Sequence, residues 1–179
     1  MGFKIALVKH KENISEYIVH MYQTEDLIRA YNFEIDEIKK YVISHLPIDK
    51  KEKEETTNWY QQIISQMKNE KNKDAGHISE LVSLVAELDM LHQSLIDKND
   101  GYTDIYKKAK SHIQSFRKLS GDPTIRDIQI CLNAVYGLLI IRLNDRPIAD
   151  DQFESVDLFG ALLSYLSYIF KQRENLAKN

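Results

Sequence analysis

The chain has 179 residues, with 24 lysines and arginines against 27 aspartates and glutamates, a formal net charge of -3 and 43% hydrophobic residues. These values fit one soluble domain with a single core, and they argue against a polycation built for nucleic acid. The longest unbroken apolar run, residues 134–141, is far shorter than the roughly 20 residues that a membrane-crossing helix needs. We therefore expect a cytoplasmic protein with no membrane span, no secretory leader and no nucleic-acid partner.

Helical periodicity runs through nearly the whole sequence, and strand-like alternation occurs only at residues 3–7. That short segment is either an extended arm or the start of a helix. The pattern therefore predicts an all-α fold, a single compact bundle of about seven helices. The expected helices cover, in chain order, residues 13–31, 32–46, 49–74, 77–97, 102–119, 123–143 and 151–175.

Turn-forming residues separate these helices. Pro47 ends the second, because proline disfavours the helical conformation in the residue before it. Asp122 and Pro123 form a start signal for the sixth, with aspartate as N-cap and proline at the first helical position. Residues 73–76 are the weakest internal joint, but there is no repeat or low-complexity linker. We expect one domain over residues 1–179.

The sixth predicted helix, near residues 123–143, is apolar on nearly every side. Ile128, Cys131 and Leu138 share one face, and Ile130 and Ile141 share another. Such a helix is usually central in a bundle. If the monomer leaves one side uncovered, that side becomes a dimer surface, because monomers seldom expose large apolar patches. We expect a homodimer through spare apolar surface on this helix or on the last one.

Three ionisable side chains occupy positions at which the helical period demands apolar residues. Glu25 interrupts the apolar stripe of the first predicted helix, His92 that of the fourth and Arg142 that of the sixth. Tyr22 and Arg29 flank Glu25. Because desolvating an isolated charge costs several kcal/mol, each of the three should have a partner. The economical pair is Glu25 with Arg142, whose guanidinium fork fits a carboxylate.

Two interpretations of these residues remain open. The first is a structural ion pair that fixes the register of the helices. The second is a pocket for a small polar ligand, or an enzyme site, because a few convergent polar groups in an apolar cavity are typical of binding sites. Under the second interpretation, the ligand-binding residues are Glu25, His92 and Arg142, with Arg29 and Tyr22 as further contributors.

Other site chemistries lack their sequence motifs. The chain has no Glu-x-x-His pair for a di-iron centre, no H-E-x-x-H zinc motif, no P-loop, no dinucleotide fingerprint and no G-x-S-x-G elbow. We therefore expect no metal, cofactor or catalytic residue, and the sequence favours a non-enzymatic role. A basic helix face lacks the aromatic residues that stack on bases, so it is typical of a solvated surface. It comprises Lys107, Lys110, Arg117 and Lys118.

Two runs resemble an uncharacterised all-helical bacterial family classed as a domain of unknown function. They are T-E-D-L-I-R-A-Y, from Thr24 to Tyr31, and I-C-L-N-A-V-Y-G-L-L-I-I-R-L, from Ile130 to Leu143. The similarity covers most of the chain and is least over residues 49–75. It implies an all-α fold in a cytoplasmic bacterial protein, and it carries over no catalytic residue. The sequence as a whole favours a binding or interaction module that is homo-oligomeric.

Overall fold

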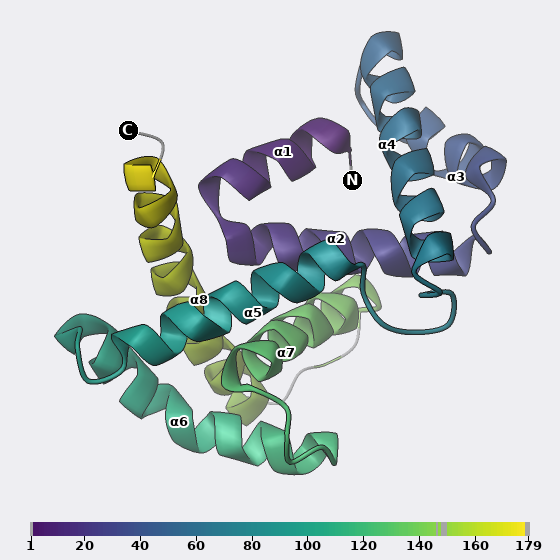
Figure 1. The fold of residues 1–179 in the computed structure, drawn as a ribbon. Coiled ribbons are helices and arrows are strands. Elements are labelled where there is room, and N and C mark those ends of the chain that lie inside the picture. Colours follow the sequence, from purple (N-terminus) through teal and green to yellow (C-terminus); the bar gives the residue numbers. More distant parts are fainter. Residues whose placement is uncertain (1, 146, 148–149, 178–179) are drawn as a thin grey trace. The chain divides into compact units, whose positions relative to one another are not determined.

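The computed structural model describes residues 2–145, 147 and 150–177, and this part of the chain forms eight α-helices and one short 3-10 helix (Figure 1). No strand occurs among these residues, so the all-α prediction is confirmed. The chain divides into two compact units, Met1–Glu12 with Glu16–Ser83, and Asn13–Ser15 with Leu84–Asn179. The boundary near residue 83 lies inside a helix and not at the joint expected near residues 73–76. That the chain forms one domain stays a prediction.

The first unit begins with a helix at residues 3–7, the segment that the sequence predicted to be either an extended arm or the start of a helix. The N–H of Phe3 donates to Thr56 Oγ1 at 3.3 Å, and Lys4 Nζ lies 2.9 Å from Glu52 Oε2. These contacts hold the first helix against the fourth. The helices that contribute to this unit are α1 (Phe3–Glu12), α2 (Ile14–Ala30), α3 (Ile35–Tyr41), the 3-10 helix η1 (Ile43–His45) and α4 (Lys50–Asn69).

The second predicted helix is shorter in the structure than the sequence indicated. Asn32 and Phe33 have φ angles of 51° and 64°, in the left-handed region, so α2 and α3 are separate helices with a turn between them. After Tyr41 the chain continues only as the short η1. The helical period of the sequence continues across the turn at Asn32–Phe33 and across the break after Tyr41. It does so because the period shows which side chains face the core, and Ile38 and Ile43 are both buried.

The second unit contains most of α5 (Ser79–Leu95), together with α6 (Asp100–Ser120), α7 (Asp127–Leu143) and α8 (Asp150–Ala177). The last three helices pack against one another. Phe116 of α6 meets Phe159 of α8 edge to face, with ring centroids 5.2 Å apart. Ile128 and Leu132 of α7 are fully buried, as are Leu162 and Leu166 of α8. These side chains form the core on which the groove described below is built.

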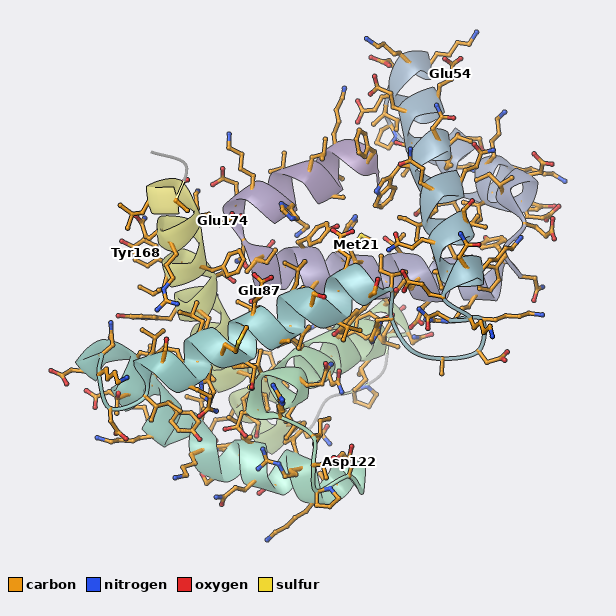
Figure 2. The ribbon with its side chains drawn as sticks, in the orientation of Figure 1. Met21, Glu54, Glu87, Asp122, Tyr168 and Glu174 are labelled. Carbon is orange, nitrogen blue, oxygen red and sulfur yellow. The ribbon has the colours of Figure 1, made fainter. Side chains whose placement is uncertain are left out.

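The helix α7 begins four residues later than predicted. Asp122 lies in the loop between α6 and α7 (Figure 2). Its Oδ1 accepts hydrogen bonds from the N–H of Thr124 at 2.8 Å and from the Thr124 hydroxyl at 2.6 Å. An aspartate that binds the backbone two residues on closes a turn. The Asp-Pro pair therefore forms a separate turn, and α7 starts at Asp127 with Arg126 as its N-cap.

The helix α8 is long and apolar enough over Gln152–Ala177 to cross a membrane, judged by length and composition alone. The central helix of a soluble protein meets the same criterion. In the structure Phe159, Leu162 and Leu166 of this helix have no exposed surface. One face of α8 therefore lies in the core of the second unit, while 39% of its most apolar stretch is buried.

Candidate functional site

Glu25 of α2 is completely buried and holds the loop that precedes α5. Its Oε1 accepts a hydrogen bond from the N–H of Ile78 at 2.8 Å, and its Oε2 lies 2.5 Å from His77 Nδ1. The ring of Tyr22 stacks on the His77 imidazole, with centroids 3.8 Å apart. Each carboxylate oxygen of Glu25 thus has a partner in the loop that precedes α5. The predicted pairing of Glu25 with Arg142 is wrong, and His77 takes that place.

Arg29 binds the same loop from the next turn of α2. Its Nη1 lies 2.8 Å from Asp26 Oδ1, and its Nη2 donates to the carbonyl oxygens of Asn72, at 3.3 Å, and Gly76. Gly76 has a φ of 87°, which glycine adopts most readily. The structure therefore brings Tyr22, Glu25 and Arg29 to one loop, where their bonds are typical of a structural role. That they bind a ligand stays a prediction.

His92 of α5 lies in the other unit, in a buried cluster of its own. Its Nδ1 is 2.5 Å from the Tyr102 hydroxyl, and its Nε2 is 3.5 Å from Asp127 Oδ2. The ring of Tyr106 meets the imidazole edge to face, with centroids 4.8 Å apart. The inward position expected for His92 is confirmed, because the side chain has no exposed surface.

Asp127, at the start of α7, is the acidic centre of this cluster. The His92 imidazole, the Tyr106 hydroxyl and the Arg117 guanidinium all face its carboxylate and hold the pKa of Asp127 well below its usual range, although burial opposes them. Burial and the bond to Asp127 raise the pKa of Tyr106 to about 12. Arg117 was expected on a solvated basic face, but it is partly buried here. The cluster joins α5, α6 and α7.

Arg142 is exposed, so the prediction that it points into the core is wrong. Its guanidinium lies over the ring of Phe153, 5.5 Å from the centroid, and that ring is itself half exposed. The helical period shows which residues share a face of α7. It does not show at which residue the neighbouring helices stop covering that face. Leu143, the next residue, is also 60% exposed.

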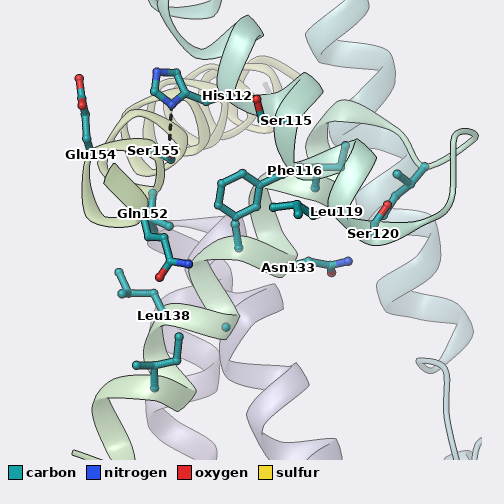
Figure 3. Close-up of a pocket in the computed structure, with 16 residues that line it drawn as sticks. His112, Ser115, Phe116, Leu119, Ser120, Asn133, Leu138, Gln152, Glu154 and Ser155 are labelled. Carbon is teal, nitrogen blue, oxygen red and sulfur yellow. Dashed lines mark hydrogen bonds between the residues drawn. The ribbon is translucent and has the colours of Figure 1, made fainter. Parts of the chain in front are cut away.

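A groove of about 620 Å³ opens in the second unit between α6, α7 and α8 (Figure 3). Its floor is α7 from Ile130 to Ile141, and its walls are the second half of α6 and the first turns of α8. Phe116 lies at its centre. At one end His112 Nδ1 is 2.8 Å from the Ser155 hydroxyl. The groove is thus mainly apolar, with a few hydrogen-bonding groups and the carboxylate of Glu154 in its lining.

Apolar side chains around the groove are left uncovered. Leu119, which lines one wall, is 81% exposed, and on α7 Ile140 and Leu143, which are not lining residues, are 37% and 60% exposed. A Cβ atom added to Gly137, on the floor, would meet no heavy atom within 4 Å. The helix that the sequence identified as apolar on every side therefore keeps an open apolar surface.

Sequence reasoning missed the partners of both buried ionisable groups. His77 follows the Ala75–Gly76 break and lies in a loop, where no period marks it. Asp127 stands in the first turn of its helix, where an aspartate is ordinary. Tyr102 and Tyr106 stand four residues apart, which places both on one face of α6, and this spacing was an available signal for the cluster. The groove depends on three helices that packing alone brings together.

Among the described residues, no three histidine, cysteine, aspartate or glutamate side chains lie close enough to hold a metal ion. No curated protein and no solved structure matches the chain. A family model described as "Domain of unknown function (DUF4924)" matches residues 3–176, including the stretch 49–75 in which the resemblance was least. With nearly its whole length matched, the chain belongs to this family of domains of unknown function.

Proposed function

We propose that this chain is a helical interaction module that forms a homodimer through the groove and the exposed apolar surface of α7. The observation that supports it is the open face of a helix that carries no charged residue between Asp127 and Arg142. Burying apolar surface contributes about 25 cal/mol per Å². An uncovered helix of this kind gains stability from a covering partner.

A second copy is the occupant that fits this surface best. Ile140 projects from α7 as an exposed knob, and the space above Gly137, its neighbour three residues earlier on the helix surface, offers a hollow. Knob and hollow on one surface suit an interface in which both copies use the same patch, as two-fold dimers do. The uncharged floor of the groove also removes the cost of burying an unpaired charge there.

A small apolar molecule is the competing occupant. The volume of the groove, about 620 Å³, falls within the range of about 300–1,000 Å³ that is usual for small-molecule sites. The alternative of a polar-ligand or enzyme site built on Glu25, His92 and Arg142 has less support. Glu25 and His92 bond to neighbours in separate clusters, and Arg142 lies exposed over Phe153.

Native mass spectrometry of the purified protein at low micromolar concentration tests the proposal. We expect the wild type at twice the chain mass of 20.9 kDa, and the double variant Ile140→Glu with Leu143→Glu at the monomer mass. Both residues are exposed, so circular dichroism should show unchanged helicity. The matched control Leu176→Glu, at a residue of α8 that is 76% exposed, should stay dimeric. A monomeric wild type, with or without a retained small molecule, contradicts the proposal, as does a dimeric double variant.

A further inference from the structure

A second hollow, of about 690 Å³, lies in the second unit where α7 begins. Side chains of α5, of the end of α6 and of the loop that leads into α7 line it. Its charged lining residues form two ion pairs, Asp89 with Arg126 and Asp127 with Arg117. None of these four residues lines the groove, so the proposed homodimer does not depend on them.

The two ion pairs differ in the hydrogen-bonding capacity that they leave for a ligand. Asp127 has both oxygens engaged, because Oδ1 binds Arg117 and Oδ2 accepts a hydrogen bond from the Tyr106 hydroxyl at 2.8 Å. Asp89 binds Arg126 through Oδ2 alone, which lies 3.1 Å from Nη1. Within the described chain, no hydrogen bond is made by Asp89 Oδ1 or by Nε and Nη2 of Arg126. The pair of Asp89 and Arg126 can therefore accept further partners on both of its charges.

The burial of Asp89 indicates that a positively charged partner belongs at its free oxygen. Its side chain is only 9% exposed, so the carboxylate has lost most of its contact with water. Buried polar atoms are normally hydrogen-bonded, because removing a charged group from water without a partner is costly. Arg126 meets this need only in part, since it binds one oxygen and its own side chain is 63% exposed. An ammonium group in the hollow would supply the donor that Asp89 Oδ1 lacks.

The start of α7 favours a negative charge beside Arg126. Arg126 is the N-cap of α7, and its side chain makes no capping hydrogen bond. The first turn of a helix carries N–H groups without partners inside the helix, together with the positive end of the helix dipole. The planar fork of a guanidinium also fits the two oxygens of a carboxylate. A ligand carboxylate therefore finds two sources of positive potential at this point of the hollow.

We propose that this hollow binds a small zwitterion, an α-amino acid with an apolar side chain. The ammonium group donates to Asp89 Oδ1, and the carboxylate accepts from the free N–H groups of Arg126. The ligand then lies antiparallel to the ion pair, so each of its charges meets an opposite charge. Met90 and Ile125 line the same hollow and offer apolar contacts to the side chain of the ligand. The volume is within the range of about 300–1,000 Å³ that is usual for small-molecule sites.

Isothermal titration calorimetry with three related probes tests the class of ligand. The probes are leucine, isoamylamine, which lacks the carboxylate, and isocaproate, which lacks the ammonium group. We expect leucine to bind with a dissociation constant of about 1 mM or below. Each of the other two should bind at least about tenfold more weakly, because each loses the hydrogen bonds of one charge. Absence of leucine binding up to about 10 mM overturns the proposal. Either partial analogue binding as tightly as leucine also overturns it.

Two substitutions test the site itself. Asp89→Asn keeps the shape of the side chain, and Arg126→Gln changes an exposed one. Each should raise the dissociation constant of leucine at least about tenfold. The matched controls Asp157→Asn and Arg142→Gln change exposed residues that do not line the hollow, so they should bind leucine like the wild type. Circular dichroism checks that each variant keeps its helicity.

A third variant distinguishes the hollow from the groove. Gly137→Leu fills part of the groove and should leave the affinity for leucine unchanged. Loss of leucine binding in Gly137→Leu places the ligand in the groove and overturns the proposal. Wild-type affinity in Arg126→Gln overturns it as well, and this exposed position decides the matter even if Asp89→Asn loses helicity. A monomeric wild type removes the proposed homodimer but leaves this site standing.

Discussion

His20 is a buried, neutral histidine whose environment opposes protonation. Its side chain is 6% exposed, its ring stacks on Trp59 with centroids 6.2 Å apart, and its Nε2 has no hydrogen-bond partner among the described residues. Burial lowers the pKa of His20 to about 4, from an ordinary value near 6.5. Between these values the unfolded chain takes up a proton that the folded chain does not. Folding stability should therefore fall as the pH decreases through this window.

We predict that the free energy of unfolding drops by about 2–3 kcal/mol between pH 6.5 and pH 4 because of this group. In His20→Gln, which cannot titrate there, that part of the pH dependence should disappear even if the variant is less stable overall. Urea denaturation over a pH series measures the slope. His45→Gln, which changes an exposed histidine, is the control and should keep the wild-type slope. An unchanged slope in His20→Gln would contradict this account of His20.

The three ionisable residues in the apolar stripes show how well a sequence predicts the burial and the partners of single side chains. The period located two buried groups, Glu25 and His92, because a polar residue in an apolar stripe must lie near the core. It failed for Arg142, in the last turn of its helix, where Ile140 and Leu143 are also exposed. It also named the wrong partner for Glu25, because His77 comes from a loop and loop residues follow no period.

Two glycines inside helices have opposite relations to the groove. Gly137 in α7 lies on its floor, whereas Gly160 in α8 is not among its lining residues. Neither has a positive φ, and a Cβ on either would meet nothing within 4 Å. Glycine in a helix interior costs roughly 0.5–1 kcal/mol relative to alanine, since the flexible unfolded chain loses more entropy on folding. A larger side chain at position 137 would therefore fill part of the groove, whereas one at position 160 would not.

We predict that Gly137→Ala and Gly160→Ala each raise the free energy of unfolding by about 0.5–1 kcal/mol, as measured by urea denaturation. The larger variants should separate the two positions. Gly137→Leu fills the hollow and should weaken the dimer, whereas Gly160→Leu should leave its dissociation constant unchanged. Loss of stability in Gly137→Ala, or equal effects of the two leucine variants on association, would contradict this.

The end of a helix could be predicted from the sequence where a single residue determines the local backbone conformation. Gly121, two residues after the predicted end of the fifth helix, has a φ of 71° and is the C-cap of α6. The Asp122–Pro123 signal misplaced the start of α7, because the same residues also form a tight turn. The conformation of the N-terminal segment could not be decided from its alternation; in the structure it is the helix α1, which contacts α4.

The described part of the chain forms two compact helical units, and the second of them contains an open apolar groove. The sequence predicted the fold class and the presence of spare apolar surface on the helix near residues 123–143. It could not predict the groove, because the lining residues come from three helices and meet only through packing. The boundary between the units, inside α5, likewise has no composition signal. Self-association through α7 is therefore the property that most needs a direct measurement.

Cross-linking at a single introduced cysteine measures it. The natural Cys131 is fully buried, so it should not react with a short bis-maleimide linker. Ile140→Cys places a thiol on the exposed surface of α7, and Leu176→Cys places one on an exposed position of α8 outside the groove. At low micromolar protein we predict a covalent dimer of twice 20.9 kDa for Ile140→Cys and a monomer for Leu176→Cys. Absence of a covalent dimer in Ile140→Cys, or equal yields in both variants, would contradict dimerisation through α7.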